Sequence, residues 1–444
     1  MAANSAAQQA RLGLPAQIGY GVGQIASQVF RDVPSLLLLF FMTNVLGIAP
    51  AIAGSAIFFP KLVGGIVFDV AAGLLSDRWL SRFKRRQWLL FGALAAPAAM
   101  VALFHVPAGT HVVQTVYIAA LFTLYMFVYA SFSVPYLGVA ADLNAPDDGR
   151  MTLMAWRMIF TSVGVLLAGG LAPGFAKAMG GGQAGYEAMA LLLGGICALA
   201  LAISWGGARL AENQVGLIQR APEQRTVLEV LRSFKTVLAD SRFSVLVGIT
   251  VLQLVGGGMA YAALLYFITY NMGRADALSQ IGIVVLLASV GIVLGQPLWV
   301  NLAKRFGKKP IYIGAALLHA LANLGWGFSA TGGVFALYGF ALLLGIGNSG
   351  WAMLGNTLAV DIAGERETGL YTSVWMASDK VGFALGGSFA LGLILSAFGF
   401  DATRAAAGLS QSQEAITGIL VGFAIAPALA NIIGAALFAK WGRA

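Results

Sequence analysis

Seven ionisable residues lie within long apolar stretches of the sequence, where a charge is costly to bury. An ionised side chain costs several kcal/mol in such surroundings unless it is paired or reaches water. The acids can bind a cation or carry a proton, and the bases can hold hydroxyls or an anion through charge-assisted hydrogen bonds. The alternative is that they form neutral pairs that only hold helices together. The seven residues are Arg31, Asp32, Lys61, Asp69, Arg157, Asp379 and Lys380.

Polar and aromatic residues recur at helical spacing in three of these stretches, and therefore gather on one helix face in each. The first face carries Gln24, Gln28, Arg31 and Ser35, the second Tyr125, Tyr129, Ser133 and Tyr136, and the third Tyr371, Trp375 and Asp379. A polar face inside a bilayer must line a cavity. Aromatic rings beside hydrogen-bonding groups suit an amphipathic ligand such as a sugar ring or a glycoside. Tyrosines can instead anchor helices at the membrane surface, which is our interpretation of Tyr266 and Tyr270.

The elements that position these residues are membrane-spanning helices. Of the 444 residues, 59% are hydrophobic and only 10% are charged, and the mean hydropathy of +0.82 excludes an ordinary soluble protein. Twelve mostly apolar stretches are each long enough to cross about 30 Å of hydrocarbon as a helix. They cover residues 17–46, 49–76, 88–108, 112–140, 151–176, 187–208, 243–270, 278–302, 310–330, 333–360, 367–397 and 415–439. We therefore expect an all-α membrane protein with twelve transmembrane helices.

Lysines and arginines alternate between the loops that join these spans. If both termini are cytoplasmic, the outer segments contain only Lys177, Arg274 and Arg404, and the other basic loop residues are all inside. Because cytoplasmic loops carry an excess of lysine and arginine, the pattern predicts a multi-pass protein of the plasma (inner) membrane with both termini in the cytoplasm. The net charge of +9 then faces anionic membrane lipids, and we expect no nucleic-acid partner.

Two loop patterns each occur twice, at nearly the same separation. "SRFKRR" (81–86) is repeated as "KRFGKK" (304–309) after 223 residues, and "VAADL" (139–143) as "LAVDI" (358–362) after 219 residues. This predicts two pseudo-symmetric six-helix halves in parallel orientation. We expect a cytoplasmic N-terminus at 1–16, an N-terminal half at 17–208, a cytoplasmic linker at 209–242 that is helical from Thr226 to Leu238, and a C-terminal half at 243–444.

Two six-helix halves joined by a cytoplasmic linker resemble the plan of the major facilitator superfamily of secondary transporters. The segment "GLLSDR" (73–78) is similar to the signature of that superfamily between helices 2 and 3. The resemblance implies that Gly73 allows two helices to approach closely and that Asp77 and Arg78 belong to a gate.

Several segments together resemble one family in particular, the glycoside-pentoside-hexuronide:cation symporters, whose best-known member is the bacterial melibiose carrier. They are "YGVGQIASQVFRD" (20–32), "VFDVAAGLLSDRWLSRFKRRQW" (67–88), "FSVPYLGVAADL" (132–143), "AWRMIF" (155–160), "VDIAGERETGLY" (360–371) and "DKVGFALGG" (379–387). The resemblance implies that Asp69 binds a coupling cation and that Arg157 and Lys380 match basic residues of helices 5 and 11.

Three acidic residues of that family's sequence pattern are replaced by other residues in this chain. Its second cation-binding carboxylate, four residues before Asp69, corresponds to Gly65, and its two sugar-binding acids correspond to Gln28 and Ser133. The basic residues of the family pattern are kept and most of its acids are not.

The features combine into a predicted secondary active transporter that moves a sugar, glycoside or related small organic solute by alternating access. Its predicted substrate contacts are Gln28, Tyr129, Ser133, Arg157, Trp375 and Lys380. The alternative substrate is anionic or amphipathic, such as a hexuronide or a lysophospholipid, since bases outnumber acids within the spans. An integral-membrane enzyme is less expected, because His105, His111 and His319 form no metal-spaced cluster and no nucleophile motif occurs. We expect no cofactor and a monomer.

Asp69 and Lys61 form the predicted ion-coupling site. Sodium needs several oxygen ligands, and Gly65 supplies none. Lys61 lies two turns before Asp69, within about 80° around the helix, and its long side chain is expected to bring an ammonium near the carboxylate. We therefore expect coupling to a proton in preference to sodium, or uncoupled movement with Lys61 as an internal counter-ion.

Overall fold

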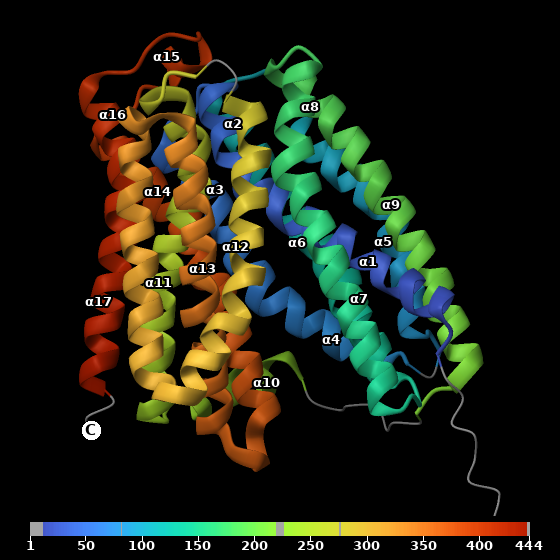
Figure 1. The fold of residues 1–444 in the computed structure, drawn as a ribbon. Coiled ribbons are helices and arrows are strands. Elements are labelled where there is room, and N and C mark those ends of the chain that lie inside the picture. Colours follow the sequence, from blue (N-terminus) through green and yellow to red (C-terminus); the bar gives the residue numbers. More distant parts are fainter. Residues whose placement is uncertain (1–11, 81, 219–225, 275–276, 442–444) are drawn as a thin grey trace, which may run out of the picture.

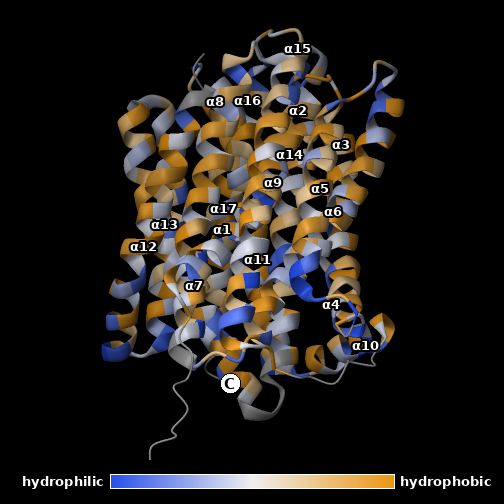
Figure 2. Cartoon of the chain, turned by 90° about the vertical axis from the view of Figure 1, so that its right-hand side faces the viewer, coloured by the Kyte–Doolittle hydropathy of each residue, from blue (hydrophilic) through white to orange (hydrophobic). Residues whose placement is uncertain are grey.

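The computed structural model describes residues 12–80, 82–218, 226–274 and 277–441. Within these ranges the chain is helical and contains no β-strand beyond one isolated bridge between Leu143 and Leu217. Apolar residues predominate along the middle of the bundle, and hydrophilic segments gather at the end that carries α10 (Figure 2). We call this end the α10 end, and the opposite one the α15 end.

Six spans precede α10. They consist of α1 (Leu14–Val33), η1 (Pro34–Leu38) and α2 (Leu39–Asn44); α3 (Pro50–Val63), η2 (Gly64–Phe68) and α4 (Asp69–Arg78); α5 (Arg85–Phe104); α6 (His111–Asp142); α7 (Asp147–Leu166), η3 (Leu167–Leu171) and α8 (Ala172–Ala178); and α9 (Gly182–Val215). The elements η1, η2 and η3 are single π turns.

The helix α10 (Val227–Leu238) begins at Thr226, whose side chain and that of Glu229 form a capping box. The chain continues with α11 (Ser241–Tyr266) and η4 (Phe267–Asn271); α12 (Ala277–Phe306); α13 (Lys308–Ala384); η5 (Leu385–Ala390) and α14 (Leu391–Ala397); α15 (Ala402–Ala406); and α16 (Gln413–Leu420), η6 (Val421–Ile425) and α17 (Ala426–Trp441).

The 77 residues of α13 contain two spans and most of a third. The chain turns at Gly333 and at Gly364, whose φ angles of +79° and +61° are accessible to glycine without strain. The segments on either side of Gly333 run back along each other, since Trp326 Nε1 donates to the carbonyl of Leu337 at 2.9 Å. The apolar stretch Lys308–Gly364 is therefore two spans, and with the other ten apolar stretches of the described residues it gives the twelve that the sequence predicts.

The spans before and after α10 form two bundles that lie side by side, and they meet at the α15 end (Figure 1). There Thr43 shares a hydrogen bond with Tyr266 at 2.6 Å, and Tyr270 donates to Asn44. Tyr266 is fully buried, so its interpretation as an anchor at the membrane surface is wrong. The two bundles also touch backbone to backbone, since a Cβ at Gly54 would lie 2.4 Å from the carbonyl oxygen of Ser388.

Candidate functional site

Arg31 and Asp32, near the C-terminal end of α1, form an ion pair. Arg31 Nε donates to Asp32 Oδ1 at 3.0 Å, and Gln28 Nε2 donates to the other carboxylate oxygen at 2.6 Å. Arg31 is surrounded by protein, yet 58% of its side chain is accessible to water. The guanidinium therefore faces a water-accessible space inside the protein.

The second ion pair connects the two halves. Lys380 of α13 donates to the carboxylate of Asp69, the first residue of α4. Gly65 lies beside this contact, because a Cβ placed there would lie 3.6 Å from Cβ of Lys380, at ordinary contact distance. The lysine stem thus passes over the position at which the family pattern has its second carboxylate.

Lys61 does not lie beside Asp69, as the sequence suggested. Its ammonium donates to Ser35 Oγ at 3.0 Å, and Ser35 in turn donates to the carbonyl of Arg31. Eight residues of helix correspond to a rise of about 12 Å, which is longer than a lysine side chain. The cation next to Asp69 therefore comes from the opposite half of the protein.

Two tyrosines and one further acid complete a central cluster. Asp379 of α13 is exposed at mid-span, close enough to Arg31 and Lys380 for electrostatic interaction. Tyr129 of α6 interacts in the same way with Lys380, Arg31 and Asp69. Tyr261 of α11 lies near Asp32 and Arg31. The sequence analysis missed Tyr261, whose only signal was a tyrosine in the middle of a span. We define the central cluster as Arg31, Asp32, Lys61, Asp69, Tyr129, Tyr261, Asp379 and Lys380.

Arg157 of α7 is held against the first span. Its Nε and Nη2 atoms donate to Gln24 Oε1 at 3.2 and 3.1 Å, and its guanidinium lies 5.3 Å from the ring centre of Tyr136. Tyr136 is itself fixed, because its hydroxyl donates to the carbonyl of Tyr20 at 3.0 Å. Arg157 is thus a cation whose hydrogen-bond partners in the described structure are all uncharged.

Three of the predicted substrate contacts are buried. Gln28 is 2% exposed and is bonded to Asp32, and Ser133 is 7% exposed. Trp375 is 8% exposed and belongs to the apolar core of the second half, where it lies against Gly355. The central cluster instead contains Tyr129 and Lys380, both partly exposed.

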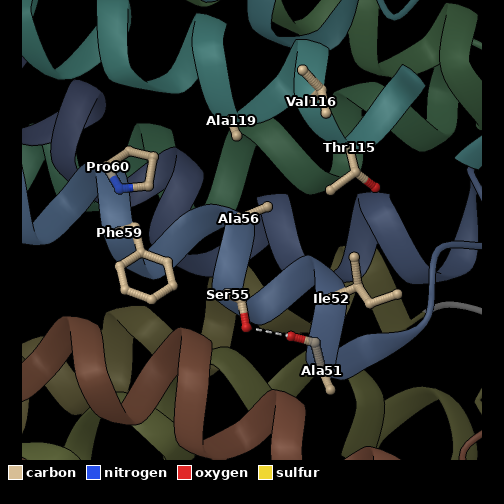
Figure 3. Close-up of a pocket in the computed structure, with 9 residues that line it drawn as sticks. All are labelled: Ala51, Ile52, Ser55, Ala56, Phe59, Pro60, Thr115, Val116 and Ala119. Carbon is tan, nitrogen blue, oxygen red and sulfur yellow. Dashed lines mark hydrogen bonds between the residues drawn. The ribbon is translucent and has the colours of Figure 1, made fainter. Parts of the chain in front are cut away.

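A separate surface pocket of about 470 Å³ lies between α3 and α6 (Figure 3). Its lining is almost entirely apolar, and the hydroxyl of Ser55 donates to the carbonyl of Ala51 at 2.8 Å. Large exposed side chains such as Ile52, Phe59 and Val116 line it. The hydroxyls of Ser55 and Thr115 both donate to carbonyls of their own helices, so this depression is poorly suited to a polar solute.

A comparison with protein families matches residues 19–440 to the model of the MFS/sugar transport proteins. The chain belongs to this family. It is 24% identical to the inner membrane symporter YicJ of Escherichia coli strain K12 over 97% of this chain and 92% of that one. It is 26% identical to the putative sulfoquinovose importer of Salmonella typhimurium strain LT2, over 92% of this chain and 85% of that one.

The fold is shared with solved transporters. The chain superposes on a bacterial homologue of the human lysosomal transporter Spinster, in its inward-facing and unoccupied conformation, with a TM-score of 0.69 at 15% identity, covering 97% of this chain and 96% of that one. As a member of the MFS/sugar transport family, the protein is a multi-pass secondary transporter, and the predicted resemblance to the glycoside-pentoside-hexuronide:cation symporters is confirmed.

A cluster of ion pairs lies at the α10 end, around Asp77, where the resemblance to the major facilitator superfamily implies a gate. Asp77 pairs with Arg85 of α5, and Arg85 Nε also lies 3.2 Å from Asp142 Oδ2 of α6. A Cβ at Gly138 would lie 1.8 Å from Arg85, whereas one at Gly73 would meet only Val134, at an ordinary 3.6 Å. Gly138 therefore leaves room for the guanidinium of Arg85, and the role of Gly73 in close helix approach stays a prediction.

The second half contains the corresponding ion pair. Lys308 and Asp361 are 2.5 Å apart, and they stand in the repeated loop patterns at the positions of Arg85 and Asp142. The sequence repeat thus reproduces one pair of opposite charges at the α10 end of each half.

Proposed function

We propose that this transporter moves a sugar, glycoside or related small polar organic solute by alternating access, and that the solute binds at the central cluster. The observation that carries the proposal is the exposure of Arg31, Asp379 and Lys380 at mid-span, between the two halves. Charged groups at that depth must pair or reach water. Tyr129 and Tyr261 supply aromatic faces next to them, a combination suited to the hydroxyls and apolar face of a sugar.

We also propose that the coupling ion is a proton in preference to sodium, with uncoupled movement as the alternative. Lys380 already neutralises Asp69, and Gly65 offers no oxygen ligand for a metal cation. The internal counter-ion of Asp69 is then Lys380, in place of Lys61. Protonation of Asp69 releases the lysine, so it links proton uptake to a contact between the halves. Lys61, bonded to Ser35, influences this site through Arg31 and Asp32.

The orientation is part of the same proposal. The excess of lysine and arginine at the α10 end favours a cytoplasmic position for that end and for both termini, in a plasma (inner) membrane. Because the two halves meet at the α15 end (Figure 1), the conformation is then inward-facing. Asp77 and Arg85, with Gly73 and Arg78 nearby, act as the cytoplasmic gate. We further propose that the protein works as a monomer among membrane lipids and is not an enzyme.

A second candidate substrate is an anionic or amphipathic solute such as a hexuronide or a lysophospholipid. Arg157 favours an anion, because among the described residues only uncharged groups hold its positive charge. The name of the sulfoquinovose importer refers to a sulfonated sugar, which also fits this candidate.

The proposal is tested with purified protein in proteoliposomes. We expect an imposed inward proton gradient to drive accumulation of a sugar or glycoside without chemical change and without sodium. The Asp69→Asn variant should lose accumulation while keeping solute exchange. The matched control is Glu414→Gln, an exposed acid at the start of α16, which should accumulate normally. A strict requirement for sodium would contradict proton coupling, and a chemically altered product would contradict the transport proposal itself.

A further inference from the structure

We propose that Arg31 binds the anionic group of the substrate, so that the preferred solutes are sugar acids carrying a carboxylate or a sulfonate. This inference rests on the proposed function, since it assigns a substrate class to the same central site. It concerns a residue to which the family resemblance assigns no role and which is not among the predicted substrate contacts.

The first observation is that Arg31 is held in position through its Nε atom. Its Nε atom donates to Asp32, and the second oxygen of that carboxylate accepts from Gln28. Gln28 is fixed by packing against Gly164 of α7. The two residues are so close that a Cβ added to Gly164 would lie 2.5 Å from the Cβ of Gln28. The orientation of the guanidinium is therefore set before any ligand arrives, which reduces the entropy cost of binding.

The second observation is that the two terminal nitrogens of the guanidinium, Nη1 and Nη2, are available to a ligand. No residue in the described ranges accepts a hydrogen bond from Nη1 or Nη2 of Arg31, and 58% of the side chain is accessible to water. Two neighbouring N–H groups on a planar cation match the two oxygens of a carboxylate or a sulfonate. Neutral hydroxyls accept such bonds less strongly because they carry no charge.

The third observation is the charge balance around Arg31. Asp32 and Asp69 already pair with Arg31 and Lys380. The remaining acid, Asp379, approaches Arg31 from the opposite half without forming an ion pair. With Lys61 and Arg157 included, the seven embedded ionisable residues have one more positive than negative charge, which a monoanion neutralises.

Arg31 and Asp379 together suit a solute that carries both an anionic group and hydroxyls. The guanidinium donates to the anionic group, and the exposed carboxylate of Asp379 accepts from hydroxyls. Tyr129 and Tyr261 lie close enough to Arg31 for electrostatic interaction, and both are partly exposed. A sugar acid satisfies all three groups at once, whereas a neutral sugar leaves the guanidinium without a charged partner.

The test compares ligands that differ only in the anionic group. Purified wild-type protein is titrated with glucose, glucuronate and a glucose bearing a sulfonate on C6, and binding is followed through the rise in melting temperature. We expect the two anions to bind at least about tenfold more tightly than glucose. Arg31→Gln should weaken anion binding about tenfold to hundredfold and change glucose binding less than about threefold. Arg31→Lys should restore part of the loss, because it keeps the charge and loses the fork geometry.

The control is Arg209→Gln, an exposed arginine in α9, which should bind every ligand as wild type does. Equal loss for glucose and for the anions in Arg31→Gln would show that Arg31 only pairs with Asp32, and would overturn the inference. Tighter binding of glucose than of either anion by the wild type would overturn it as well, while leaving the proposed function intact. If no sugar or sugar acid binds at all, both the inference and the proposed function fail.

Discussion

Alanine at Gly138 is expected to break the charge cluster at the α10 end. The added Cβ would lie 1.8 Å from Nη1 and 2.7 Å from Cζ of Arg85. Ordinary contact between such atoms requires about 3.5 Å, so the guanidinium must move by about 1–2 Å. A shift of that size separates Arg85 from Asp77 and from Asp142.

The expected cost follows from the burial of these groups. Removing one partner of a buried ion pair costs about 3–5 kcal/mol, but Asp77 is 27% exposed and Arg85 is 13% exposed, so we take about 2–3 kcal/mol after screening by solvent. Alanine offsets part of this, because it is about 0.5–1 kcal/mol better than glycine inside a helix. We expect a net loss of about 1–2 kcal/mol in the free energy of unfolding.

The measurement is unfolding of the purified protein by sodium dodecyl sulfate in mixed micelles, followed by tryptophan fluorescence. Gly73→Ala is the matched control, because its Cβ meets only Val134, at 3.6 Å, and it should leave stability unchanged or raise it slightly. In an Arg85→Ala background the cost of Gly138→Ala should disappear, since the clashing side chain is gone. An equal cost with and without Arg85 would refute the reasoning.

Three further predictions address topology, substrate contact and the closed end. A cysteine in the 398–413 segment should react with an impermeant reagent on intact cells, and labelling only after lysis would reverse the proposed orientation. Arg157→Ala and Lys380→Ala should each reduce uptake by at least about tenfold with normal membrane insertion, and normal uptake by both would make these charges structural. Gly54→Val should separate the halves at the α15 end and speed labelling of a cysteine at position 46, while Gly174→Val, which meets nothing within 4 Å, should not.

The fold could be predicted from the sequence because span length and apolarity depend only on local composition. The predicted spans 310–330 and 333–360 are separated in the structure by the turn at Gly333, which hydropathy alone locates correctly. The predicted helix start at Thr226 likewise corresponds to a capping box, a signal contained in four consecutive residues.

The partners within the site could not be predicted in the same way. Periodicity showed that Gln28 and Arg31 share a face, but the assignment of Lys380, in place of Lys61, to Asp69 depends on how the two halves dock. Docking also determines that Tyr266 is buried against Thr43. Sequence spacing predicts which residues share one helix face. Which helix packs against that face depends on the tertiary structure.

The contacts between the halves are of two kinds, and this bears on how the transporter can alternate. At the α15 end they are neutral hydrogen bonds, one between the hydroxyls of Tyr266 and Thr43 and one from the amide of Ala51 to Ser396, beside the close backbone contact at Gly54. Each such bond contributes about 0.5–1.5 kcal/mol net, so the loss of these bonds adds only a few kcal/mol to the cost of opening this end. That is the size of gap across which two conformations remain populated. Among the described residues, the charged contact between Asp69 and Lys380 lies deeper between the halves, and breaking it leaves two partly buried charges without a partner. Solute or proton binding at the central cluster can therefore decide which conformation is favoured, because it acts on this charged contact.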